Sequence, residues 1–237
     1  MLKCKQLSHR FGKLLAVNNL SFRVKKEEIF GIAGPNGAGK TTLFNLITGF
    51  YQGSGEIVFE GENIHGCKPY EICHKGIART FQIPEVFLTL PVIENVRVGA
   101  HFGNSGIRNE KKNIKEAIHF VGLDGKENVI GTNLKLLDKK LVMIAAALAT
   151  KPKLLLLDEP IAGLSTHETR QCVDMFKQIN KDLGLTIIII EHFMKVLTEL
   201  SDRLLILQNG GEICVDSPLA VTNNKKVIEC YLGEDHA

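Results

Sequence analysis

The sequence predicts an α/β fold with a mainly parallel sheet, an antiparallel β part and an inserted α-helical part. A glycine-rich loop, Gly34–Thr42, lies between a short apolar stretch and a stretch with helical spacing. Two apolar runs, Leu154–Leu157 and Ile187–Ile190, are typical of buried strands. Between residues 84 and 150 helical patterns dominate and strand signals are few. These three observations together predict the fold class.

The N-terminal part alternates apolar and polar residues over 2–7 and again over 20–24. Such alternation is typical of half-buried strands, and Glu56–Gly61 adds a strand that ends in a turn. We therefore expect an antiparallel strand group beside the glycine-rich loop. The further elements expected before residue 84 are strands over 29–33 and 77–81 and helices over 41–50 and 69–75.

The middle of the chain changes character after Gln82. Pro91 suits the first position of a helix, and Glu110–Val121 has an amphipathic helical pattern. A very apolar, alanine-rich helix is expected over Leu141–Thr150. Residues 84–150 are therefore expected to form a helical insertion within the α/β part.

The α/β pattern resumes after residue 150. Ser165 followed by Glu168 is a capping-box signature for the start of a helix, and Asn209–Gly211 is a hairpin signal. The elements expected here are strands over 153–158, 186–191, 203–208 and 212–215 and helices over 165–184, 193–200, 220–223 and 226–232.

The composition is that of an ordinary globular protein, with 44% hydrophobic and 23% charged residues. The net charge of +3 is too small to predict a nucleic-acid partner. No apolar run approaches the roughly 18–20 residues that cross a bilayer, and the N-terminus has no secretory signal pattern. Six scattered cysteines without a C-x-x-C pair predict reduced, mostly buried thiols in a cytosolic protein.

The glycine-rich loop matches the P-loop pattern G-x-x-x-x-G-K-[ST] at every fixed position. Its strand–loop–helix context turns backbone amides and a helix N-terminus toward a phosphate chain. Lys40 would reach the β- and γ-phosphates and the Thr41 hydroxyl would reach Mg²⁺; a glycine-rich turn without a ligand is the alternative. The candidate nucleotide-binding residues of the loop are Asn36, Gly37, Ala38, Gly39, Lys40, Thr41 and Thr42.

A second signal is the run Leu154–Leu157 followed by Asp158 and Glu159, which is the Walker B arrangement. The carboxyl ends of strands are where α/β sheets place their ligands. Asp158 would hold Mg²⁺ directly or through water, and Glu159 would polarise the attacking water as a general base. The alternative is a strand that leads into an acidic turn.

Two weaker signals are Gln82 and His192, each expected just after a strand. Gln82 would contact Mg²⁺ and the attacking water, and His192 would hydrogen-bond the γ-phosphate. A histidine at a helix start without a ligand is the alternative for His192. Only the order of these residues along the chain makes them informative.

Taken in order, the P-loop, Gln82, the helical insertion, the Asp158-Glu159 pair and His192 resemble the nucleotide-binding domain of ABC transporters. The resemblance covers essentially the whole chain. It implies a single ABC ATPase domain over 1–237, with a P-loop (RecA-like) core and antiparallel β part over 1–83 and 151–237 and a helical subdomain over 84–150. It implies ATP and Mg²⁺ as cofactors, Glu159, His192 and Gln82 as catalytic residues, and Thr41, Gln82 and Asp158 as metal ligands.

The resemblance also implies partners and a location. Phe11 matches the aromatic residue that stacks on adenine, with a core phenylalanine as the alternative. Members of the family work as dimers that sandwich two ATPs and drive a transmembrane permease. The apolar segment Ile83–Leu90 matches the place where such a permease docks, which implies a peripheral protein on the cytoplasmic face of the membrane and no nucleic-acid partner.

Three stretches, Ala78–Gln82, Leu90–Val96 and Val227–Gly233, resemble the ATP-binding subunits of branched-chain amino acid importers. The ATPases of lipopolysaccharide export and urea import remain alternatives, as does a soluble ABC ATPase outside transport. A P-loop GTPase is disfavoured because Thr150–Lys153 lacks the aspartate of the N/T-K-x-D motif that reads the base. A nucleic-acid motor is disfavoured by the near-neutral charge.

One stretch departs from the family pattern. Its signature L-S-G-G-Q corresponds here to Leu134–Asp138, which lacks the serine and both glycines. Bulky leucines would hold the backbone away from the partner's γ-phosphate, and Asp138 would bring a carboxylate near it. We therefore favour a heterodimer with a second ABC ATPase that has a regular signature; a homodimer is the alternative.

Overall fold

The computed structural model describes residues 1–103 and 109–232. The chain divides into two compact units, the first formed by Met1–Ile72 and the segment from Thr186 onward, the second by Cys73–Leu185. Both units combine strands with helices, so the predicted α/β class is confirmed.

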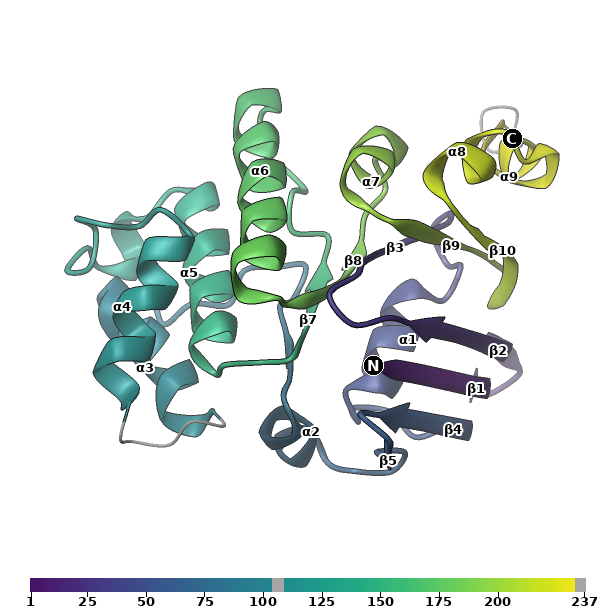
Figure 1. Cartoon of the computed structure of the whole chain (residues 1–237), viewed down its shortest axis with the longest axis horizontal. Coiled ribbons are helices and arrows are strands. Elements are labelled where there is room, and N and C mark those ends of the chain that lie inside the picture. Colours follow the sequence, from purple (N-terminus) through teal and green to yellow (C-terminus); the bar gives the residue numbers. More distant parts are fainter. Residues whose placement is uncertain (104–108, 233–237) are drawn as a thin grey trace. The chain divides into compact units, whose positions relative to one another are not determined.

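The first unit contains an antiparallel sheet in the order β2-β1-β4-β5 (Figure 1). Leu2 pairs with Val24 and Cys4 with Phe22 in the β1–β2 register, and all four side chains are buried. The period-two alternation of the sequence therefore marks the buried face of this sheet. The strands are β1 (Leu2–Phe11), β2 (Leu14–Val24), β4 (Ser54–Phe59) and β5 (Glu62–Asn63).

The same unit contains parallel strands around β3 (Ile29–Ala33), which is buried throughout. It pairs with β8 (Thr186–Ile190) on one side and β9 (Arg203–Gln208) on the other. Parallel strands bring their carboxyl ends to one edge of a sheet. The loop after β3 and the bend after β8 therefore share that edge.

A hairpin returns the chain from β9 to β10 (Gly211–Asp216). Asn209 and Gly210 have φ of +49° and +78°, the left-handed pair that a tight hairpin turn requires. The helices of this unit are α1 (Lys40–Ile47), α7 (Met194–Leu200), α8 (Pro218–Thr222) and α9 (Lys225–Leu232). Helix α2 (Pro69–Lys75) contains the boundary between the two units.

The second unit pairs β6 (Ile77–Arg79) in parallel with β7 (Leu154–Asp158). It also contains a group of helices that pack on one another (Figure 1). A Cβ at Gly99 would lie 1.9 Å from the carbonyl oxygen of Ala146, so α3 and α5 are in close backbone contact. The helices are α3 (Val92–Phe102), α4 (Glu110–Phe120), η2 (Gly131–Asn133), α5 (Leu136–Ala149) and α6 (Thr166–Leu183).

Two expected boundaries in this unit were wrong. Helix α5 begins at Leu136 and not at Leu141, because the polar run at 138–140 interrupts the apolar pattern without interrupting the helix. Strand β6 ends at Arg79, since the amide of Phe81 donates to the sulfur of Met143 and leaves the strand ladder. Both changes alter which residues lie beside the strand ends.

In residues 1–103 and 109–232, no helix has the length and apolar character needed to cross a membrane. The six cysteines are free thiols, three of them buried and three half-buried. Burial raises the pKa of the Cys4 and Cys73 thiols above their ordinary value, which keeps them in the unreactive protonated form.

Candidate nucleotide-binding and hydrolysis site

The P-loop connects β3 to α1 and depends on its glycines. Gly37 and Gly39 have φ of +77° and +98°, which side-chain-bearing residues rarely adopt. A Cβ at Gly39 would lie 2.2 Å from the carbonyl oxygen of Ala16, so no larger residue fits there. The backbone of the loop is therefore specified by its glycines.

Lys40 opens α1 and is buried, with 6% of its surface exposed. Its Nζ donates to the carbonyl oxygens of Gly34 (2.6 Å) and Pro35 (2.9 Å), which holds the ammonium within the loop. The first turn of α1 contains no acidic residue, so the positive end of the helix dipole is available to an anion. Of the other loop candidates, Asn36, Gly37 and Thr41 are exposed, Thr42 is half-buried and Ala38 is buried.

His192 lies in the bend between β8 and α7 and its side chain is exposed. Ile190 pairs with Ile32, and the amide of Glu191 donates to the carbonyl of Ile32 (3.4 Å). The bend at His192 thus follows directly on a strand that neighbours the strand leading into the P-loop. Within the first unit, the P-loop with Lys40 and the bend with His192 therefore lie at the same edge of the sheet. Both residues are predicted to contact phosphate.

Phe11 ends β1 with 45% of its surface exposed, so the interpretation as a core phenylalanine was wrong. Its ring meets His9 and Tyr51 edge-on, with centroids 4.6 and 5.3 Å away. His9 and Tyr51 are themselves stacked at 5.2 Å. An exposed aromatic cluster offers a flat surface to a planar base. The sequence did not indicate His9 and Tyr51, because their proximity to Phe11 depends on tertiary structure.

The second unit brings Gln82 and Glu159 together. Gln82 Nε2 donates to Glu159 Oε2 at 2.6 Å, although the residues are 77 positions apart. Glu159 is 7% exposed and has φ of +47°, an uncommon backbone conformation for a residue with a side chain. The preceding residue, Asp158, is 1% exposed. Asp158 ends β7 and Glu159 follows it, whereas Gln82 lies three residues beyond the end of the neighbouring strand β6.

Asp158 is held by a residue that the sequence analysis missed. Arg79 Nη2 lies 2.9 Å from Asp158 Oδ2, and both side chains are almost wholly buried. The Arg79 guanidinium also lies 4.9 Å from the centroid of the Phe81 ring. An arginine inside a short apolar strand was a usable signal, because a buried guanidinium requires a carboxylate partner.

The signature-equivalent segment Leu134–Asp138, which we call the lid segment, includes the N-cap and the first three residues of α5. Lys135 is the N-cap, with an extended backbone and no side-chain cap bond, and Leu136 is 44% exposed. Asp138 Oδ1 accepts a hydrogen bond from Lys126 Nζ at 2.7 Å, so its charge is paired within the unit. The expected repulsion between Asp138 and a phosphate is therefore weakened by this ion pair.

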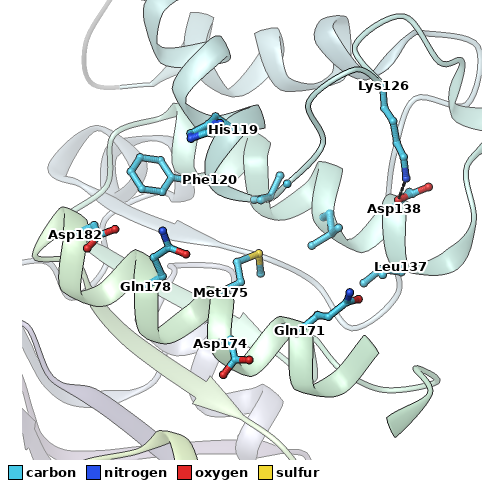
Figure 2. A pocket seen from close by; sticks show the side chains of 14 residues that line it. His119, Phe120, Lys126, Leu137, Asp138, Gln171, Asp174, Met175, Gln178 and Asp182 are labelled. Atoms are coloured by element: carbon cyan, nitrogen blue, oxygen red, sulfur yellow. Dashed lines mark hydrogen bonds and ion pairs between the residues drawn. The ribbon is translucent and has the colours of Figure 1, made fainter. Parts of the chain in front are cut away.

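A pocket of about 880 Å³ opens beside the lid segment between α4, α5 and α6. Figure 2 shows the Lys126–Asp138 pair at one end of it and Met175 pointing into it from α6. None of the predicted ATP-binding or catalytic residues lines this pocket. Within the second unit it is distinct from the Gln82–Glu159 contact.

Residues 17–162 match the ABC transporter family. The chain belongs to this family. It is 34% identical over 250 residues to the high-affinity branched-chain amino acid transport ATP-binding protein BraF of Pseudomonas aeruginosa. It is 36% identical over 250 residues to LivG of Salmonella typhimurium, which carries the same description. Each alignment covers 99% of this chain and 98% of the relative.

The fold of this family member agrees with a solved ATP-binding cassette. The ADP conformation of MJ1267, an ATP-binding cassette of an ABC transporter, superposes with a TM-score of 0.88 at 30% identity. The match covers 98% of both chains. The chain is thus an ABC ATP-binding cassette, which is an ATPase domain that binds nucleotide.

Proposed function

We propose that this chain hydrolyses ATP to power an ABC importer of branched-chain or related amino acids. The similarity to BraF and LivG over 99% of the chain supports the importer class and the solute. The observation that carries the hydrolytic role is the 2.6 Å contact between Gln82 and Glu159 at the end of the Walker B strand. Lipopolysaccharide export, urea import and a role outside transport are the competing functions.

In the proposed mechanism, the P-loop amides and the N-terminus of α1 bind the phosphate chain of ATP. Lys40 neutralises charge on the β- and γ-phosphates, and the exposed ring of Phe11 stacks on adenine. Glu159 accepts the proton of the attacking water, and Gln82 orients that water together with the carboxylate. His192 donates a hydrogen bond to the γ-phosphate, where negative charge develops.

The donor chemistry fits Mg²⁺, which prefers hydroxyl, carboxylate and amide oxygens and keeps several waters. Thr41 offers an exposed hydroxyl in the first turn of α1, and Asp158 offers a carboxylate whose Oδ2 is oriented by Arg79. Gln82 directs its Nε2 to Glu159, so its Oε1 is the atom that would serve the metal. When bound, Mg²⁺ neutralises charge on the β- and γ-phosphates.

We propose that the chain consists of a core over 1–83 and 151–237 and a helical subdomain over 84–150. The exposed apolar segment Ile83–Leu90 is the proposed contact with the permease at the cytoplasmic face of the membrane. The side chains of Ile83 and Phe87 are 75% and 57% exposed. Buried Asn95 stabilises this segment, because it accepts from the Phe87 amide (2.7 Å) and donates to the Leu90 carbonyl (3.2 Å).

The proposed second ATPase is a different chain with a regular signature. Support comes from the lid segment, where Lys135 and Leu136 stand in the positions of a serine and a glycine. The Leu136 side chain also lies close to Gly163, since a Cβ added at Gly163 would lie 3.1 Å from Leu136 Cδ2. A regular signature supplies a hydroxyl and closely approaching amides to the other chain's phosphate, and this segment offers bulkier groups.

The test is to purify this chain from membranes through an affinity tag and to identify its associated proteins. Recovery of permease subunits together with ATP-dependent uptake of leucine, isoleucine or valine into proteoliposomes is the expected result. Recovery of an export complex for lipopolysaccharide, or uptake of urea, would replace the proposed solute. Absence of any permease, with ATP hydrolysis in solution, would replace the transport role altogether.

A further inference from the structure

Lys140 lies on α5, two residues beyond the lid segment, and only 2% of its surface is exposed. The other buried residues of α5 are all apolar. Among the lysines that the structure describes, the only other buried one is Lys40 of the P-loop. Removing an ammonium from water has a large free-energy cost, so a buried lysine requires a compensating interaction.

One such interaction is with the residue proposed as the general base. Lys140 Nζ donates to the backbone carbonyl oxygen of Glu159 at 3.1 Å. The same oxygen accepts a hydrogen bond from the Ala162 amide at 3.3 Å. The ammonium therefore stabilises the turn that follows the Walker B strand. Because the donor is charged and the contact is buried, this hydrogen bond is stronger than an average backbone bond.

Glu159 requires such support, because its backbone is left-handed with φ of +47°. A residue with a side chain remains in that region only where surrounding contacts specify it. The direction of the Glu159 side chain, and hence its contact with Gln82, depends on this backbone conformation. A donor fixed to the Glu159 carbonyl from a rigid helix therefore sets the direction of the carboxylate.

We propose that Lys140 is a positioning residue for ATP hydrolysis, which holds Glu159 in its catalytic conformation through the Glu159 carbonyl. It does not touch ATP or the attacking water. The proposal rests on the proposed function, in which Glu159 is the base. It also links the base to the lid segment, since Lys140 follows the lid segment within the first turns of α5.

The test compares Lys140→Met, Lys140→Arg and the matched control Lys139→Met in the complex purified through this chain. Lys140→Met keeps the length and helix propensity of the side chain and removes the donor. We expect kcat to fall roughly 10- to 100-fold, because a small misplacement of a catalytic group costs that much. The KM for ATP should stay within about twofold, since uniform binding is unchanged.

Lys140→Arg should restore most of kcat, and Lys139→Met should leave it unchanged. In a Glu159→Gln background, Lys140→Met should have no further effect on the single-turnover rate, because the two residues act as one unit. A kcat of Lys140→Met close to wild type would overturn the proposal. So would a loss of kcat that persists in the Glu159→Gln background and is not rescued by arginine, which would indicate a folding defect.

Hydrogen exchange gives a readout that does not depend on hydrolysis. In Lys140→Met the Ala162 amide should exchange roughly tenfold faster, the size expected for losing one charged hydrogen bond. An unchanged rate would refute the positioning role. If the wild-type complex hydrolysed no ATP, the proposed function would fail, and the exchange rate of Ala162 would still decide whether Lys140 holds this turn.

Discussion

Glu159 combines three constraints that a carboxylate seldom meets together. It is buried, its backbone is left-handed, and its side chain accepts a hydrogen bond from Gln82. A carboxylate at an ordinary strand end would be free to turn toward solvent. The combination is what a general base needs, because proton transfer depends first on geometry.

Glu159→Gln should therefore lower kcat by roughly 10²- to 10⁴-fold, the range typical of losing a general base. ATP binding should remain, since Lys40 and the P-loop are untouched. Turnover assays together with fluorescent-nucleotide titration measure both quantities. Glu116→Gln is the matched control, because this half-buried glutamate on α4 pairs with Lys151 outside the proposed site. Turnover close to that of the control would remove Glu159 from the mechanism.

A second residue-scale feature stabilises the strand that leads to the P-loop. Arg203 Nε lies 2.6 Å from Glu28 Oε1, and Glu28 is 5% exposed. Hydrogen bonding to Glu28 raises the pKa of Arg203 above its ordinary value, so the guanidinium is charged at all accessible pH. The pair links β9 to the residue just before β3.

Arg203→Met should lower the free energy of unfolding by about 3 kcal/mol, because it leaves the Glu28 carboxylate buried without its main partner. Denaturant unfolding of the purified chain measures the change. Lys13→Met, in the exposed turn between β1 and β2, is the control and should change stability by less than about 0.5 kcal/mol. Equal stabilities of the two variants would contradict the assigned role.

At the scale of elements, α6 has the most complete start signal in the chain. Ser165 accepts from the Glu168 amide, and the Glu168 carboxylate accepts from the Ser165 amide at 2.8 Å, which is a full capping box. The hydrogen bond from the Ser165 side chain lowers the pKa of Glu168 below its ordinary value. The sequence pattern and the observed element agree because every atom involved lies within four residues.

Ser165→Ala should therefore destabilise the protein in a pH-dependent way. A lowered folded-state pKa means that Glu168 stabilises the fold above its unfolded pKa, and that this contribution disappears as the pH falls through the folded value. The difference in melting temperature between wild type and Ser165→Ala should be largest above the ordinary pKa of a glutamate, about 4.3, and should shrink as the pH falls below it. Thr166→Ala, one residue into the helix, should show no such trend.

At the scale of the whole molecule, the chain has a regular P-loop and Walker B but an irregular lid segment. Its own catalytic residues would then depend on a lid from another chain. This asymmetry is the reason for proposing a heterodimer rather than a homodimer. The Lys126–Asp138 pair moderates the charge of the lid segment without restoring the missing hydroxyl and glycines.

Purified alone, the chain should hydrolyse ATP slowly, and addition of the second ATPase of the complex should raise turnover by about 10²-fold, the cost of missing oxyanion-type donors. Lys40→Ala in this chain should then remove most of that activity. The corresponding lysine change in the second ATPase should remove much less. Full activity from this chain alone would instead indicate a homodimer with a working lid.

The sequence predicts best the features that depend on residues adjacent in the chain. The P-loop, the Walker B strand and the α6 cap each combine a local backbone requirement with an adjacent chemical group. The start of α5 was missed because Asp138 and Lys140 appear as surface charges in the sequence. Lys140 is nevertheless buried, and the backbone carbonyl oxygen of Glu159, 19 positions away, accepts a hydrogen bond from it.

The sequence by itself determined that the chain is an α/β P-loop protein with Lys40, Asp158 and Glu159 in recognisable motifs. The tertiary structure alone decided which distant groups complete them. Gln82 and Arg79 reach the acidic pair across 77 and 79 positions, and Lys140 reaches Glu159 across 19. No local pattern specifies the partner in these contacts, because each is created by the packing of strands and helices that are remote in the chain.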